Sequence, residues 1–313
     1  MTAKLRTIFM GTPEFAVPSL RLLADTTELA LVVTQPDRPS GRGRRLEPPP
    51  VKRIAVELGV EVLQPESVKG GAFRTRIAAL APDVIVTAAF GRILGRRLLE
   101  LPRLGCLNVH ASLLPAYRGA APIAWAIRSG EEVSGVSIMR MDVGLDTGPL
   151  YRQERVPILE EETAGELTTR LSLVGAEILG RVLADLPSGL LPEPQDESLA
   201  SAAPPLTKED GRIDWRLDAR AVHDHVRAMH PWPCATTAVG DDIVKVHRAA
   251  IVAATGGLTG APGVVLEHTR DGVVVACGGG AVRLVELQMP GKRRLDAAAF
   301  RAGLRIESGT LLG

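Results

Sequence analysis

Residues 105–125 read GCLNVHASLLPAYRGAAPIAW, an apolar strand that ends in a polar turn. In an extended chain, residues two apart share a face, so Cys106, Asn108 and His110 point the same way. Asn disfavours strands, and both Asn108 and His110 are polar side chains on an otherwise apolar strand. A carboxamide and an imidazole that project side by side from a strand end indicate a functional site. The alternative is a hydrogen-bonded pair that only closes the strand.

The chain on either side of this stretch alternates apolar runs with helical patterns. Apolar runs at 5–10, 29–34 and 83–89 are each followed by a turn and a helix, as in a doubly wound α/β domain. We therefore expect residues 1–186 to form an α/β, Rossmann-like, mostly parallel sheet. Ligands bind such sheets beyond the carboxyl ends of the strands, which is where Asn108 and His110 fall.

A glycine-rich loop, DVGLDTG at 142–148, follows a further apolar run at 131–141. It resembles a calcium loop only superficially, because Gly144 holds the third position and Gln153 the twelfth, where a bidentate Glu is needed. We instead expect the loop to hold the Asp146 carboxylate on a rigid turn beside His110. Next, a helix is predicted at 163–186, with Thr163 as its cap and Glu166 three residues on.

Residues 34–50 form a long loop rich in proline, glycine and arginine, QPDRPSGRGRRLEPPP from position 35. A loop of this length without structure of its own is usually functional. Its arginines could contact phosphates, and the alternative is a solvated insertion. The arginines are Arg38, Arg42, Arg44 and Arg45.

The last third of the chain is predicted to be a separate domain. Residues 187–206 contain five prolines and are expected to be a semi-rigid linker. Residues 207–313 begin with a helix at 219–229 and continue with short β-type runs separated by Gly and Asp turns. This pattern predicts a small β-barrel. The runs lie at 243–246, 263–266, 272–276 and 282–287.

The composition excludes several classes of protein. The chain has 313 residues, 45% of them hydrophobic, and a net charge of +1, so any binding to nucleic acid needs a local basic patch. Its three cysteines lie far apart, which fits a reducing compartment and no disulfide framework or zinc knuckle. It shows no secretory signal and no apolar stretch of about 18 residues. We therefore expect a cytoplasmic protein without membrane segments.

Asn108, His110 and Asp146 combine a neutral hydrogen-bond donor, a group that titrates near neutrality and a carboxylate. No Ser or Cys occupies a nucleophile elbow. The residues therefore favour direct attack of one substrate on another through an oxyanion, which Asn108 and a charged His110 would stabilise.

Seven runs of the sequence, in order, resemble the bacterial methionyl-tRNA formyltransferases, a family that uses 10-formyltetrahydrofolate. The resemblance covers nearly the whole chain, and its most specific part is the Asn-x-His strand with SLLP and the downstream D-x-G-x-D-T-G. It implies a formyl transfer from the folate to methionyl-initiator tRNA for translation initiation, without a metal. The runs are GTPEFA, TQPDRPSGRGRRL, AAFGRIL, LGCLNVHASLLPAYRGAAPI, MDVGLDTGPL, KEDGRIDW and PWP.

The resemblance also implies roles for individual residues. Asn108, His110 and Asp146 would be catalytic. The folate site would be lined by Ser112, Leu113, Leu114 and Pro115, with Phe90 and Ile93 near the pterin and Asp142 in the same wall. The basic loop, with Arg38, Arg42, Arg44 and Arg45, would contact tRNA, as would an OB-like C-terminal barrel, in a monomer. Members often carry Tyr where Phe90 stands and Gln where Ala124 stands.

Other functions stay open on the sequence alone. A related enzyme could formylate a sugar nucleotide or hydrolyse formyl-folate, but the 34–50 loop favours tRNA. A nucleotide-linked oxidoreductase would need a glycine fingerprint, and the first turn has only Gly11-Thr12-Pro13. A non-catalytic RNA-binding module is disfavoured by the neutral net charge and by the Asn–His pair.

Overall fold

A computed structural model describes residues 4–40, 45–253, 260–296 and 306–313, and the chain divides into two units. Unit 1 consists of Met1–Pro122, Val133–Pro157 and Thr168–Pro204. Unit 2 consists of Ile123–Glu132, Ile158–Leu167 and Pro205–Gly313. Unit 2 therefore takes two short segments from within residues 1–186, the range that the sequence predicts to form the first domain.

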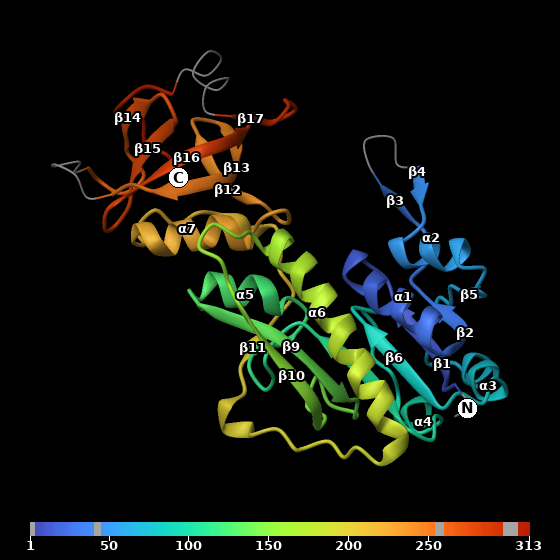
Figure 1. The fold of residues 1–313 in the computed structure, drawn as a ribbon. Helices are drawn as coiled ribbons and strands as arrows, with labels where there is room; N and C mark the ends of the chain where they lie inside the picture. Colours follow the sequence, from blue (N-terminus) through green and yellow to red (C-terminus); the bar gives the residue numbers. More distant parts are fainter. Residues whose placement is uncertain (1–3, 41–44, 254–259, 297–305) are drawn as a thin grey trace. The chain divides into compact units, whose positions relative to one another are not determined.

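Unit 1 is built on a seven-stranded sheet in the order β10-β9-β7-β6-β1-β2-β5 (Figure 1). Its five parallel strands are β1 (Arg6–Gly11), β2 (Glu28–Val33), β5 (Val62–Leu63), β6 (Val84–Ala88) and β7 (Cys106–His110). The sheet confirms the predicted Rossmann-like fold. From β1 the chain moves outward to β2 and β5 and then returns to β6, so the topological switch point lies between β1 and β6.

Two antiparallel strands complete one edge of this sheet, β9 (Val133–Arg140) and β10 (Leu150–Pro157). The sequence predicts β9 but not β10. The reason is that β10, LYRQERVP, is an edge strand whose residues 152–155 are all exposed, so its sequence lacks the apolar pattern of a buried strand.

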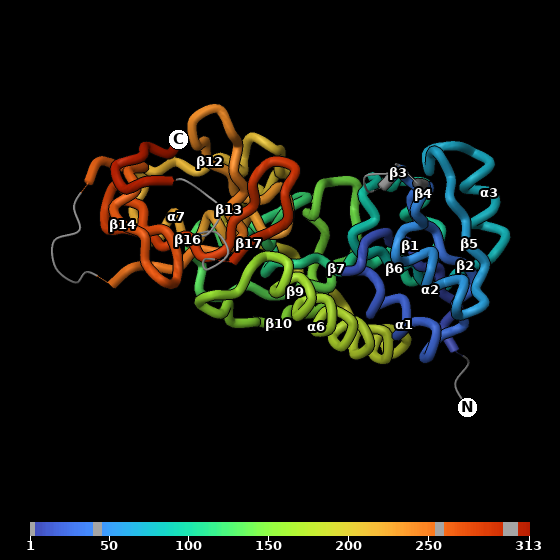
Figure 2. The backbone as a smooth tube through the Cα atoms, turned by 90° about the horizontal axis from the view of Figure 1, so that it is seen from above, coloured from blue at the N-terminus to red at the C-terminus, as the bar shows by residue number. Residues whose placement is uncertain are grey.

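Helices lie on both faces of the sheet. On one face, α3 (Gly71–Ala79) and α4 (Arg96–Leu99) pack in a buried cluster with β1, β6 and Cys106. On the other face lie α1 (Val17–Thr26) and α6 (Ala164–Asp185), which contact each other through Leu22 and Gly180 (Figures 1 and 2). Asn108 and His110 share the α3–α4 face with Cys106, because they lie two and four residues further along the strand.

The 34–50 region contains a short hairpin, although the sequence predicts a loop without its own structure. β3 (Arg38–Ser40) pairs antiparallel with β4 (Arg45–Glu47), and α2 (Pro50–Glu57) follows. Arg42 and Arg44, two of the predicted phosphate contacts, lie outside the described residues.

Unit 2 contains an antiparallel sheet in the order β12-β13-β16-β15-β14, with β17 paired to β16. The C-terminal residues bridge its two ends, because Leu312 pairs with Val239 of β12 and Leu311 pairs with Val264 beside β14. The sequence predicts a small β-barrel here, and the structure confirms a separate β domain, whose strands are antiparallel. Its strands are β12 (Ala235–Val239), β13 (Asp242–Ile251), β14 (Val265–Thr269), β15 (Gly272–Ala276), β16 (Ala281–Gln288) and β17 (Leu295–Asp296).

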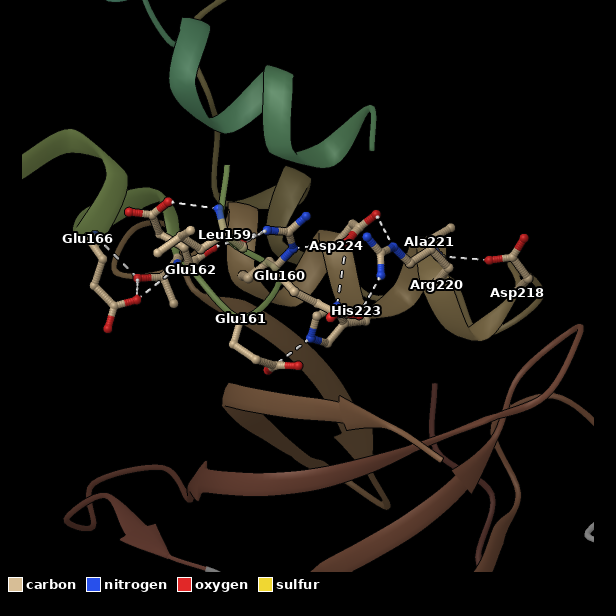
Figure 3. Close-up of polar contacts among 12 residues, drawn as sticks. Leu159, Glu160, Glu161, Glu162, Glu166, Asp218, Arg220, Ala221, His223 and Asp224 are labelled. Carbon is tan, nitrogen blue, oxygen red and sulfur yellow. Dashed lines mark hydrogen bonds and ion pairs between the residues drawn. The ribbon is translucent and has the colours of Figure 1, made fainter. Parts of the chain in front are cut away.

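Helix α7 (Ala219–Ala228) explains why residues 158–167 belong to unit 2 (Figure 3). Its buried Arg227 pairs with Asp224 at 2.9 Å and donates to the carbonyls of Leu159 and Glu162 at 3.1 and 3.3 Å. His223 lies 3.2 Å from a carboxylate oxygen of Glu161. The buried Arg227 guanidinium thus has partners both on its own helix and on residues 158–167. These contacts fix the segment to α7. Unit 2 also contains α5 (Pro122–Arg128), apart from its first residue.

Two glycines of α6 should respond oppositely to alanine, which helix interiors favour by about 1 kcal/mol. At Gly180 an added Cβ would lie 3.4 Å from the nearest Leu22 methyl, so we expect Gly180→Ala to raise the free energy of unfolding. At Gly175 the Cβ would lie 2.8 Å from Cγ1 of buried Val109, and we expect Gly175→Ala to lower it by about 1–3 kcal/mol. Urea denaturation measures both changes. Stabilisation by Gly175→Ala would contradict the packing of α6 on β7.

Candidate active site

Asn108 is held by a neighbour on the adjacent strand. Thr87 of β6 lies opposite it in the parallel register, and the Thr87 hydroxyl lies 2.8 Å from Asn108 Oδ1, which accepts the hydrogen bond. Because Oδ1 already accepts this hydrogen bond, Nδ2 is the group of the Asn108 amide that can donate to a ligand. Thr87 was not among the residues predicted from the sequence, although a hydroxyl on an otherwise apolar strand could have indicated it.

His110 is buried, at 5% exposure, between two oxygen acceptors. Its Nε2 lies 3.1 Å from the carbonyl oxygen of Tyr117, and its Nδ1 lies 3.6 Å from Oδ2 of Asp146. Because a carbonyl can only accept, Nε2 carries the proton, and Nδ1 is the nitrogen that can take a second one. Burial lowers the pKa of His110, while Asp146 and the Tyr117 carbonyl act in the opposite direction. The lowered pKa favours a neutral imidazole at rest, whereas the sequence led us to expect a charged His110.

Asp146 lies on the loop between β9 and β10. Side chains of this loop form hydrogen bonds that fix its conformation. Oδ1 of Asp142 accepts hydrogen bonds from the Gly144 amide at 3.0 Å and the Thr147 hydroxyl at 2.8 Å. Oδ2 of Asp146 accepts from the Gly119 amide at 2.9 Å, which directs the carboxylate to His110. The structure thus brings Asn108, His110 and Asp146 to one edge of the sheet.

Three residues around this edge have left-handed backbones although they are not glycine. The φ angles are +44° at Ala89, +61° at Tyr117 and +55° at Asp146. Such conformations cost on the order of 1–3 kcal/mol each and persist where the surroundings impose them, commonly at functional sites. Tyr117 and Asp146 are the two residues that face His110, so the strain coincides with the groups that orient the imidazole.

The turn at 112–115 is fixed mainly by hydrogen bonds to its own backbone. The Ser112 hydroxyl donates to the Ala116 carbonyl at 2.6 Å, and Ser137 donates to the Ser112 carbonyl at 2.6 Å. Gln153 donates to the Leu114 carbonyl at 2.8 Å. Ser112 and Leu114 are buried, whereas Leu113 and Pro115 are half-buried. Ser112 therefore shapes the turn, while Leu113 and Pro115 retain exposed surface.

The other predicted folate residues lie in different environments. Phe90 is buried in the apolar cluster beneath the switch point, and Ile93 is 72% exposed. The Asp142 carboxylate is used within its own loop. Phe90 and Ile93 thus follow β6 at the carboxyl edge of the sheet, whereas Asp142 follows β9, which runs antiparallel to β7. Ile93 is the accessible apolar side chain of the three.

A cavity of about 390 Å³ opens at the switch point, in the size range of small-molecule sites. It lies between the ends of β1, β2 and β6 and the 34–50 hairpin. Gln35 crosses it and donates to the Phe90 carbonyl at 3.1 Å. Two predicted site residues, Phe90 and Arg38, contribute to its wall. The lining residues are Thr12, Pro13, Gln35, Pro36, Arg38, Glu47, Pro49, Ala89, Phe90 and Gly91.

Cys106 shares the strand face of Asn108 and His110, but its chemistry is different. Burial raises the pKa of its thiol to about 12, so it stays protonated and unreactive at neutral pH. Within the described ranges, no group of three or more His, Cys, Asp or Glu side chains is arranged to hold a metal ion. Nor does that part of the chain contain a helix both long and apolar enough to cross a membrane.

We expect the His110 imidazole to titrate below the ordinary histidine value of about 6.5, because burial disfavours its charged form. Asp146→Asn should lower the pKa further, since it removes the carboxylate that favours the proton. Long-range ¹H–¹⁵N NMR spectra over a pH series measure this, with His110→Gln to assign the signal. A pKa that rises in Asp146→Asn would contradict the arrangement.

Comparison with known proteins identifies the family. The family model described as formyl transferase matches residues 5–183, and the formyl transferase C-terminal domain model matches residues 205–305. Among curated proteins, methionyl-tRNA formyltransferase of Citrifermentans bemidjiense is 50% identical over 311 residues, which cover 99% of this chain and 96% of the relative.

Solved structures show the same fold at low sequence identity. HypX from Aquifex aeolicus in complex with tetrahydrofolic acid aligns with a TM-score of 0.62 at 20% identity, over 96% of this chain and 47% of HypX. Methionyl-tRNA formyltransferase from Clostridium thermocellum aligns with a TM-score of 0.55 at 14% identity, over 79% of this chain and 94% of that one. Sequence matches over both units, together with this fold, show that the chain belongs to the methionyl-tRNA formyltransferases of the formyl transferase family.

Proposed function

We propose that this enzyme transfers the formyl group of 10-formyltetrahydrofolate to the free amino group of methionyl-initiator tRNA. The products are N-formylmethionyl-tRNA, used in translation initiation, and tetrahydrofolate. The observation that carries the proposal is 50% identity over 99% of the chain to a methionyl-tRNA formyltransferase, which spans both units. A tetrahydrofolic acid complex among the proteins of this fold supports the choice of folate.

Asn108 is proposed to stabilise the oxyanion of the reaction. The neutral α-amino group attacks the formyl carbon, a C–N bond forms, and the carbonyl oxygen becomes negatively charged. Asn108 Nδ2 would donate to that oxygen, and the Thr87 hydroxyl would keep the amide in the required orientation by holding Oδ1. Donors fixed before the reaction need no reorganisation as the charge develops.

His110 and Asp146 are proposed to move the proton. The amine loses a proton as the new bond forms, and folate N10 must gain one as its bond to the formyl carbon breaks. A neutral His110 can accept the proton at Nδ1, where the Asp146 carboxylate 3.6 Å away stabilises the imidazolium. The same nitrogen, or a water held by Asp146, then returns the proton to N10, so no net proton is consumed.

The remaining assignments belong to the same proposal. Leu113, Pro115 and Ile93 would contact the folate directly through their exposed surfaces. Ser112, Leu114, Phe90 and Asp142 would shape the walls of its site from behind. Residues 1–186 would carry catalysis, 187–206 would lead to the next domain, and 207–313 would bind tRNA. We further propose that the enzyme acts as a cytoplasmic monomer.

Arg38, Arg42, Arg44 and Arg45 are proposed to bind tRNA phosphates. Arg38 stands on β3 and is exposed, so it can reach a ligand in solution. The chain as a whole has a net charge of +1, and attraction to RNA must therefore come from such a local cluster. Phosphate contacts of this kind make binding weaken steeply with salt.

The test of the proposed function is formation of N-formylmethionyl-tRNA from charged initiator tRNA and 10-formyltetrahydrofolate. We expect Asn108→Ala to lower kcat by about 10²- to 10³-fold, the usual cost of losing one oxyanion donor. Thermal unfolding of the variant and the wild type shows whether Asn108→Ala is still folded. Near-normal turnover by a folded Asn108→Ala would remove Asn108 from the mechanism, and no product with the wild type would refute the function itself.

We expect Arg42→Glu to raise KM for tRNA and to leave KM for the folate unchanged, because Arg42 is proposed to meet only phosphate. The dependence of log KM on log salt should become shallower by about one ion per lost contact. Steady-state kinetics at several salt concentrations measure both. Arg181→Glu, on α6, is the matched control. If folate KM rose equally, the assignment of the loop to tRNA would be wrong.

A further inference from the structure

The segment that follows α6 does more than connect two domains. It begins with a 3₁₀ turn at Leu186–Ser188, and Glu193 then exchanges two backbone hydrogen bonds with Leu150 of β10, at 2.7 and 2.8 Å. Further on, β11 (Ala202–Ala203) pairs with β8 (Arg118–Gly119). The sequence predicts a semi-rigid spacer here, yet residues up to Pro204 belong to unit 1. We call residues 186–204 the strap.

Gln195 of the strap contacts the backbone of the loop that carries Asp146. Its Nε2 donates to the Asp146 carbonyl at 2.8 Å and to the Gly148 carbonyl at 2.7 Å. Its Oε1 accepts from Nε and Nη2 of Arg118, at 3.2 and 2.7 Å. The two protons and two lone pairs of the amide are thus all used. One side chain therefore spans the 146–148 turn and Arg118.

Arg118 is itself fixed by the strap. Its guanidinium forms a bidentate pair with Glu197, with both N–O distances at 2.8 Å, and its side chain is only 12% exposed. The Arg118 amide donates to the Ser201 carbonyl at 2.8 Å. A bidentate arginine–carboxylate pair fixes geometry as well as charge. The Arg118 guanidinium, which donates to Gln195 Oε1, is therefore itself held in a fixed position.

The next residue, Gly119, joins the strap to the carboxylate of Asp146. Its amide donates to Asp146 Oδ2, and its Cα lies so close to β11 that an added Cβ would stand 2.4 Å from the Ala203 carbonyl oxygen. Asp146 is thus held at both ends, by Gly119 at the carboxylate and by Gln195 at the backbone carbonyl. These bonds offset the cost of its left-handed backbone.

We propose that Gln195 is a positioning residue for formyl transfer, which keeps the Asp146 carboxylate directed at His110 by fastening the 146–148 turn to Arg118. Gln195 does not touch His110 and acts only through the loop. This inference rests on the proposed role of Asp146. A displacement of about 1 Å in a reacting group can cost about 10²-fold in rate, so loss of the clamp should reduce turnover rather than substrate binding.

The experiment is a double-mutant cycle between Gln195→Leu and Asp146→Asn, with kcat and both KM values measured for formyl transfer. Leu matches Gln in size but removes all four hydrogen bonds. We expect Gln195→Leu to lower kcat by about 10- to 100-fold with KM values within about twofold. In the Asp146→Asn background it should change kcat by less than about twofold, because Gln195 then has no carboxylate to position.

Two further variants separate positioning from stability. Gln195→Asn keeps the amide but is too short to bridge both carbonyls and Arg118, so it should lose turnover in the same way while unfolding near the wild-type temperature. Leu191→Gln alters an 82% exposed strap residue and should leave kcat unchanged. Wild-type kcat in both Gln195 variants, or additive losses in the cycle, would overturn the proposal. Wild-type kcat in Asp146→Asn would instead refute the proposed site.

Discussion

The hydrogen bond from the Gly119 amide to the Asp146 carboxylate is the contact on which the arrangement of the site depends. It joins β8 to the 142–148 loop, between residues that are 27 positions apart in the chain. Tyr117, two residues before Gly119, presents the carbonyl that accepts from His110 Nε2. One short stretch of backbone therefore fixes both the tautomer of the imidazole and the carboxylate opposite its other nitrogen. If the Tyr117 carbonyl or the Asp146 carboxylate moved, Nδ1 would no longer be the unprotonated nitrogen that faces the carboxylate.

The backbone is strained at the residues that set this geometry. Tyr117 and Asp146 both adopt left-handed conformations, at about 1–3 kcal/mol each. The compensation comes from hydrogen bonds, each with a net contribution of about 1 kcal/mol, supplied by β8, the strap and the 142–148 loop. Since no single bond outweighs the strain, the loops can hold these conformations only together. The site is therefore a cooperative unit of three segments rather than a set of independently placed side chains.

Much of the fold and of the candidate site could be predicted from the sequence, namely those features that a local sequence pattern determines. The period of two in the strand placed Asn108 and His110 on one face, and the apolar runs predicted the parallel sheet. The capping pattern at Thr163 is confirmed, because Thr163 and Glu166 exchange hydrogen bonds between each side chain and the other residue's backbone amide. The glycine spacing at 142–148 correctly indicated a turn that presents Asp146 to His110.

The features that the sequence did not reveal depend on contacts between distant residues. Gln195 meets a turn that lies 49 residues earlier, and nothing in its immediate neighbours distinguishes it from a solvent-exposed glutamine. The proline-rich composition of the strap predicted a semi-rigid linker and did not indicate what the chain packs against. Strand β10 was missed because an edge strand does not need an apolar face. The assignment of residues 158–167 to unit 2 follows from the buried Arg227, whose partners are backbone carbonyls that no sequence pattern identifies.

In the proposed mechanism, the balance of forces on His110 lets the enzyme work with neither a nucleophile of its own nor a strong base. Burial alone would keep the imidazole neutral but would also make it a poor proton acceptor. A carboxylate within hydrogen-bonding distance would raise the pKa of the imidazole further. At 3.6 Å, with the carboxylate already bonded to the Gly119 amide, Asp146 opposes the effect of burial without overcoming it. In the proposed mechanism the imidazole is neutral at rest and gains an electrostatic partner when the attacking amine releases its proton. A general base suits this chemistry best when its pKa lies near the working pH, and the Asp146 carboxylate limits how far burial lowers the pKa of His110.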